Sequence, residues 1–151
     1  MKATRRTALK TSGAFATLVS LGIITQQQAM AAVGRAGFEA KNLADALKAV
    51  GGEAASNDQV AVVSPDIAEN GAVVPVGATS KIPNTTEIYL LVEKNPSPLA
   101  AKFMIPAGTA ADVQTRLRMG QSTNVVAVVK ADGKLYSATK ETKVTLGGCG
   151  G

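Results

Sequence analysis

Histidine and tryptophan are both absent from this 151-residue chain, and cysteine occurs once, at Cys149. Without histidine the chain has no imidazole ligand for a metal and no Ser–His or Cys–His pair for nucleophilic catalysis. Acidic residues are scattered singly, and no glycine-rich phosphate loop with GK[ST] spacing is present. The sequence therefore predicts a protein that is not an enzyme and that uses no metal and no other cofactor.

Aromatic residues make up only 3% of the chain, whereas hydrophobic residues as a whole make up 46%. Such a composition is typical of a globular protein, and 151 residues suffice for one domain with its own core. Because aromatic side chains are so few, that core has to be built mainly from Val, Leu, Ile and Ala.

The net charge of +5 is concentrated at the N-terminus. Four of the 16 basic residues lie within the first ten positions, so the chain after residue 31 has 12 basic residues against 11 acidic ones. Arg116 and Arg118 share one face of a predicted strand, where a solvated face is favoured over an anion site. The near-neutral balance predicts no nucleic acid partner.

Residues 1–31 have the order of an export signal: a basic start, an apolar stretch over 14–24, and a small-residue cleavage site, Ala29-Met30-Ala31. The apolar stretch is shorter than the roughly 20 residues that a membrane span needs, so no stable membrane association is expected. The mature chain is expected to begin near Ala32.

Arg5 and Arg6 lie in the segment 4-TRRTALK-10, which resembles a twin-arginine export signal. Ala8 stands where that signal usually has an aromatic residue, and an ordinary secretory signal is the alternative. The leader predicts a periplasmic protein. A lone cysteine in that oxidising compartment is either free or bonded to another molecule.

The body of the chain, residues 32–146, is predicted to be one domain of the all-β class. One amphipathic helix is expected over 38–52, ended by Gly51 and Gly52. Seven strands follow, separated by turn residues such as Asp132-Gly133, which favours a hairpin. The predicted strands are 59–63, 72–76, 87–93, 99–105, 113–119, 124–130 and 134–144. This spacing predicts an immunoglobulin-like β-sandwich with one N-terminal helix.

Two of the predicted strands are apolar on both faces, over 88–92 and 125–129. A sandwich strand with one face in water should alternate between apolar and polar residues. Either the N-terminal helix covers the second face, or a partner subunit does. In the second case Leu91 would face the partner.

The chain ends in a glycine-rich arm, residues 147–151, in which Gly147 and Gly148 precede Cys149 and Gly150 and Gly151 follow it. Glycine accepts most backbone conformations, so the arm is expected to be flexible. Its length lets the thiol stand about 10 Å from the body. No neighbouring group lowers the thiol pKa. The arrangement favours an attachment point that other proteins act upon.

The leader, the early segment beginning FEAK, the all-β body and the terminal GGCGG together resemble the SoxY family, the sulfur-compound carriers of the bacterial thiosulfate-oxidising Sox system. The resemblance implies that Cys149 holds thiosulfate and its oxidation intermediates covalently. It also implies a heterodimer with a SoxZ-like subunit. Transient partners would be a c-type cytochrome, a sulfate-releasing hydrolase and a sulfane dehydrogenase. The alternative is a secreted structural sandwich that dimerises through a Cys149–Cys149 disulfide.

Overall fold

The structure is a computed structural model that describes residue 35 and residues 37–145. Within that part the eight-residue helix α3 (Leu43–Val50) precedes nine strands. The strands are β1 (Ala55–Ser56), β2 (Val60–Val63), β3 (Ile67–Ala68), β4 (Val74–Ser80), β5 (Thr85–Val92), β6 (Leu99–Met104), β7 (Asp112–Leu117), β8 (Thr123–Ala131) and β9 (Lys134–Val144).

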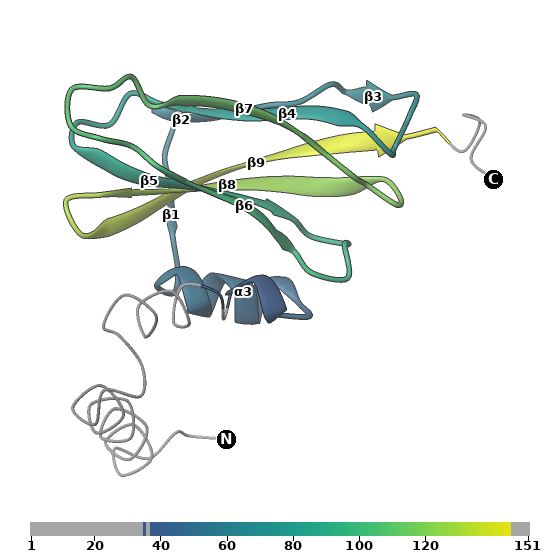
Figure 1. Ribbon diagram of the computed structural model, residues 1–151, viewed down its shortest axis with the longest axis horizontal. Helices are drawn as coiled ribbons and strands as arrows, with labels where there is room; N and C mark the ends of the chain where they lie inside the picture. The colour runs from purple at the N-terminus through teal and green to yellow at the C-terminus, as the bar shows by residue number, and fades with distance from the viewer. Residues whose placement is uncertain (1–34, 36, 146–151) are drawn as a thin grey trace, which may run out of the picture. The chain divides into compact units, whose positions relative to one another are not determined.

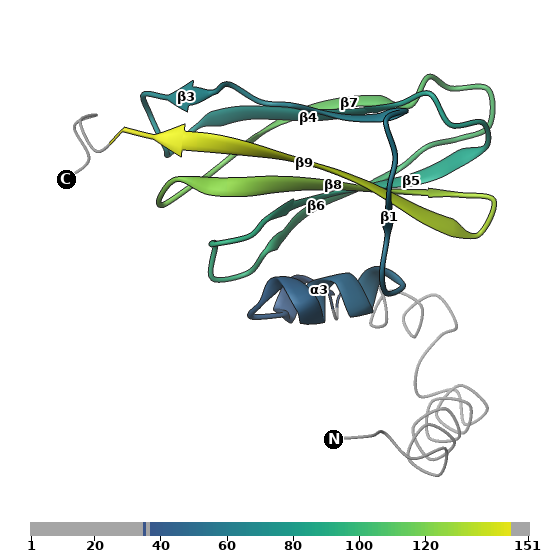
Figure 2. The ribbon, with the colours of Figure 1, turned by 180° about the vertical axis from the view of Figure 1, so that it is seen from behind.

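The strands form two sheets that stack as a sandwich (Figure 1). The larger sheet has the order β1-β9-β8-β5-β6, with β3 also paired to β9, and the smaller has the order β2-β4-β7. Only β1 and β3 run parallel to their partner, which in both cases is β9. The view from behind shows α3 against the outer face of the larger sheet (Figure 2). The predicted all-β sandwich with one helix is confirmed.

The core between the two sheets is almost entirely aliphatic, as the scarcity of aromatic residues predicted. Alternate residues of β5 and β8 point into it from the larger sheet, and alternate residues of β4 meet them from the smaller one. Its twelve buried members are Val60, Ala68, Val74, Val76, Ala78, Ile88, Leu90, Val92, Met119, Val125, Ala127 and Val129.

A second core lies between α3 and the outer face of the larger sheet. Its buried members are Ala46, Val50, Tyr89, Leu91, Leu99, Val126 and Val128. The apolar second faces of β5 and β8 are therefore covered by this chain's own helix, and Leu91 is fully buried beneath it. The helix alternative is confirmed, and the expectation that Leu91 faces a partner subunit is wrong.

The helix itself begins later than the predicted 38–52. Residues 37–39 are helical, but the helical conformation is interrupted at Ala40 and α3 starts at Leu43. The reason is Asn42, whose side-chain oxygen accepts the backbone N–H of Asp45 at 2.8 Å and caps the new helix. At the other end Gly51 adopts φ 137°, which ends the helix as predicted.

Strand β4 runs over Val74–Ser80, whereas the prediction was 72–76. It continues through Gly77, where a β-carbon would lie 2.6 Å from the Val113 carbonyl oxygen, so glycine allows the close pairing with β7. The strand over 134–144 and the Asp132-Gly133 turn are confirmed, both turn residues having positive φ. The two-residue strands β1 and β3 were not predicted.

Candidate functional site

The residues that the sequence singled out for function lie outside the described part of the chain. They are Cys149, the arm glycines Gly147, Gly148, Gly150 and Gly151, and the leader arginines Arg5 and Arg6. The part of the candidate site that the structure describes is the end of β9, from which the chain continues toward Cys149.

The end of β9 is bonded on both sides. On one side it pairs with β3, where Lys143 N–H donates to the Asp66 carbonyl at 2.9 Å and Thr145 N–H to the Ala68 carbonyl at 3.1 Å. On the other side Val144 N–H donates to Ser122 Oγ at 2.9 Å. Figure 1 shows β3 beside the arrowhead of β9. The backbone is therefore fixed as far as Thr145, four residues before Cys149.

Close packing at Gly71 holds this end of the sandwich together. Gly71 carbonyl accepts the Met119 N–H at 2.7 Å. A β-carbon at position 71 would lie 2.4 Å from the Met119 carbonyl oxygen and 2.9 Å from Cγ1 of Val144. Only glycine can occupy such a position, since real β-carbons do not approach other atoms so closely.

A polar latch ties the segment before β3 to β9. Lys140 Nζ donates to the Ser64 carbonyl at 2.6 Å and lies 3.0 Å from Oδ1 of Asp66. The buried Thr142 hydroxyl donates to Ser64 Oγ at 2.9 Å. Sequence analysis missed this latch, because Ser64 and Thr142 are 78 residues apart and no local pattern links them. The latch places β3 against the last residues of β9.

A second polar cluster lies on the outer face of the larger sheet, beside α3. Tyr89 donates its hydroxyl hydrogen bond to Glu87, and Lys102 Nζ lies 3.6 Å from the same carboxylate and 5.5 Å from the centre of the tyrosine ring. Burial, together with this hydrogen bond and the charge of Glu87, raises the pKa of Tyr89 well above its usual value. The phenol therefore stays protonated at neutral pH and is a structural donor, not an acid–base group.

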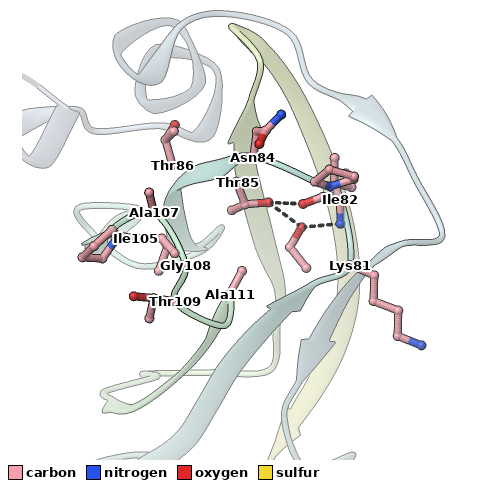
Figure 3. Close-up of a pocket in the computed structure, with 13 residues that line it drawn as sticks. Lys81, Ile82, Asn84, Thr85, Thr86, Ile105, Ala107, Gly108, Thr109 and Ala111 are labelled. Atoms are coloured by element: carbon pink, nitrogen blue, oxygen red, sulfur yellow. Dashed lines mark hydrogen bonds between the residues drawn. The ribbon is translucent and has the colours of Figure 1, made fainter.

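A cavity of about 390 Å³ lies between the segments 80–86 and 105–111, which connect the two sheets (Figure 3). Two of its hydroxyl groups bond to one another: Thr85 Oγ1 lies 2.9 Å from Ser80 Oγ and donates to the Ile82 carbonyl at 2.8 Å. Figure 3 shows Lys81 extending away from the cavity. Thr85 pairs with Ala131, so the cavity lies at the opposite end of β9 from Thr145.

Residues 35 and 37–145 contain no group of three or more Cys, Asp or Glu residues placed to hold a metal ion. Arg116 in β7 and Arg118, which directly follows the strand, are both exposed, as expected for a solvated face. None of the helices in the described ranges is long and apolar enough to cross a membrane.

The fold and these surroundings define a class of protein: a β-sandwich whose last strand is fixed by hydrogen bonds as far as Thr145, four residues before Cys149. The particular family follows from comparison. The chain belongs to the SoxY family, since the family model described as sulfur oxidation protein SoxY matches residues 46–149.

Solved structures agree with this assignment. The sulfur carrier protein SoxY from Chlorobium limicola f thiosulfatophilum is 39% identical, with a TM-score of 0.64 over 71% of this chain and 95% of that chain. A superoxide reductase (neelaredoxin) from Ignicoccus hospitalis is 19% identical, with a TM-score of 0.51 over 58% of this chain and 80% of that chain, and shares only the fold. No curated protein matches the chain.

Proposed function

We propose that this chain is a sulfur carrier that holds thiosulfate and its oxidation intermediates covalently on Cys149 and presents them to partner enzymes. The observation that supports this most directly is the extent of the family match, which runs to position 149 and so includes the only cysteine of the chain. A relative that is 39% identical is described as a sulfur carrier protein. The chain itself would perform no catalysis.

The geometry of the sandwich fits a carrier. Hydrogen bonds hold β9 as far as Thr145, so Cys149 lies four residues beyond the last hydrogen-bonded residue of the sandwich. At roughly 3.3–3.6 Å per residue, Cys149 can stand at most about 14 Å from Thr145. Glycine on either side of Cys149 adds no side-chain bulk. Such an arm can enter a narrow active site while the sandwich stays outside.

The proposed reaction begins with two steps on Cys149. In the first, the thiol and thiosulfate form a sulfur–sulfur bond, the thiol proton is released, and two electrons pass to a c-type cytochrome. The product is a cysteine S-thiosulfonate. In the second, a hydrolase adds water to the terminal sulfonate, which leaves as sulfate with two protons and leaves a persulfide on the cysteine. A sulfane dehydrogenase is proposed to oxidise the remaining outer sulfur to a sulfonate, taking oxygen from three molecules of water and passing six electrons to a c-type cytochrome. Hydrolysis of that sulfonate releases sulfate and restores the cysteine.

The carrier is proposed to work in the periplasm, exported by the leader that contains Arg5 and Arg6, as a heterodimer with a SoxZ-like subunit. Covalent attachment keeps each intermediate at a high local concentration and prevents its loss by diffusion. Because the larger sheet is covered by α3, the stable subunit has to bind elsewhere than on the face over Leu91.

The test is the substitution Cys149→Ser. The variant should fold normally and lose all thiosulfate-dependent cytochrome reduction when mixed with the partner enzymes, because no other thiol is available. Intact-protein mass without reductant should show sulfur or thiosulfonate adducts on single chains of the wild type and none on the variant. A doubled mass without adducts would favour the disulfide-linked structural dimer, and activity in Cys149→Ser would refute the carrier function.

A further inference from the structure

Exposed apolar side chains gather near the end of β9. The described part of the chain has five large hydrophobic residues that are well exposed, and three of them, Val63, Ile67 and Val73, lie on the segments that adjoin this end. We call these three residues the exit patch. Their exposed fractions are 45%, 58% and 51%.

One member of the exit patch contacts the last residues of β9 directly, and the other two lie within two residues of positions that contact β9. Ile67 pairs directly with Lys143. Val63 precedes Ser64, which bonds to Thr142 and Lys140.

Val73 follows Gly71 by two residues, and a β-carbon at Gly71 would touch the side chain of Val144. Figures 1 and 2 both show β3 and the start of β4 close to the arrowhead of β9.

The fold does not need these side chains to be apolar. In β3 the core contact is made by Ala68, which is 5% exposed, whereas Ile67 on the opposite side faces solvent. In the same way Val74 is buried in the core while Val73 is not. Single exposed hydrophobic residues are common on protein surfaces, whereas several of them on neighbouring segments favour an interaction site.

The reach of the arm identifies the occupant. If Cys149 is the attachment site, as proposed above, then any enzyme acting on it must come within about 14 Å of Thr145. Such an enzyme cannot avoid the end of the sandwich that the exit patch occupies.

Met104, the most exposed hydrophobic residue at 64%, serves as the contrast. It pairs with Glu87, and the register across β5 and β8 puts it level with Leu135. That level lies eight residues, or about 26 Å, along β9 from Lys143. The arm cannot reach it, and an enzyme engaged with Cys149 has no need to touch it.

We propose that the exit patch is the common docking surface for the enzymes that act on Cys149, and that each of them presents an apolar rim around the entrance to its active site. The inference rests on the carrier function. Contact between the patch and the rim aligns the arm with the entrance, so that only the arm differs in conformation from one enzyme to the next.

The test uses the double substitution Ile67→Thr and Val73→Thr in the full chain, with Met104→Thr as the matched control. Threonine is β-branched and keeps strand propensity while removing apolar surface. Each purified variant is titrated into a periplasmic extract from a strain that lacks this chain, and thiosulfate-dependent reduction of cytochrome c is followed. Melting temperature and the rate of alkylation by iodoacetamide show that the fold and the thiol are unchanged.

We expect the concentration for half-maximal rate to rise about tenfold in the double variant, with the maximal rate kept, and to change less than about twofold in Met104→Thr. An unchanged half-maximal concentration in the double variant overturns the proposal. Loss of the co-purifying subunit from the double variant also overturns it, because the patch would then belong to the stable interface. Turnover by Cys149→Ser in the same extract would be a separate result, because it would refute the carrier function on which the docking surface rests.

Discussion

Truncation of Leu91 tests whether α3 covers the larger sheet in solution. Leu91 is fully buried between the sheet and the helix, against Ala46 and the valines of β8. Replacing a leucine in such a position by alanine costs about 3 kcal/mol, because the lost transfer free energy is joined by the cost of the cavity. That is a large part of the roughly 5–15 kcal/mol by which domains are stable. The melting temperature should fall by about 10 °C.

Urea unfolding followed by circular dichroism measures this loss. The midpoint of Leu91→Ala should fall by roughly 1.5–2 M with an unchanged m value. Met104→Ala on the neighbouring strand is the control, and its exposed side chain should give a change within about 0.5 kcal/mol. If the two variants have the same midpoint, α3 does not pack on Leu91, and the second face of the sheet needs another cover.

Three further outcomes are expected. Tyr89 keeps its proton to higher pH in the folded protein than in the unfolded chain, so its deprotonation in the unfolded chain lowers stability as pH rises above about 10. Tyr89→Phe should therefore lose less unfolding free energy than the wild type between about pH 8 and 11. An identical loss in both proteins would contradict the assigned burial. Gly148→Pro fixes φ at position 148 and restricts the backbone of Gly147, so turnover by the partner enzymes should fall. Stability and alkylation by a small reagent should stay unchanged, and Gly148→Ala should reduce turnover less. Full turnover with proline would show that no bend is needed there. Replacing Arg5 and Arg6 by lysine should leave unprocessed precursor in the cytoplasm, whereas normal processing, detected by immunoblot of the cell fractions, would indicate the general secretory route.

The sequence was sufficient for the elements whose signals are local. The strand over 134–144 and the Asp132-Gly133 turn were predicted because alternation and turn chemistry are set by neighbouring residues. The late start of α3 also had a local signal, since Asn42 is a good N-cap with an acidic residue three positions on. The prediction of a helix over 38–52 rested on Leu43, Leu47 and Val50, whose spacing does not mark where the helix begins.

The features that the sequence missed depend on distant residues. The strands β1 and β3 have two residues each and exist because β9 offers them a parallel edge. Which of two occupants covers Leu91 was undecided, since apolar faces look the same whether a helix or a subunit lies on them. In the candidate site, Cys149 and its glycines stand out from composition alone, whereas the Ser64–Thr142 latch and the exit patch required the fold.

The position of β9 in the larger sheet has a consequence for synthesis. Ala55 of β1 pairs with Tyr136 and Ile67 of β3 pairs with Lys143, so two early strands have no partner until β9 is made, and β9 is the last of the described strands. Contacts this distant in sequence make folding slow, and they form only once residues up to about Val144 have left the ribosome. A chain can therefore fold completely only when it has been synthesised to within five residues of Cys149. Any step that accepts only folded molecules thus also rejects nearly every chain that was truncated before Cys149.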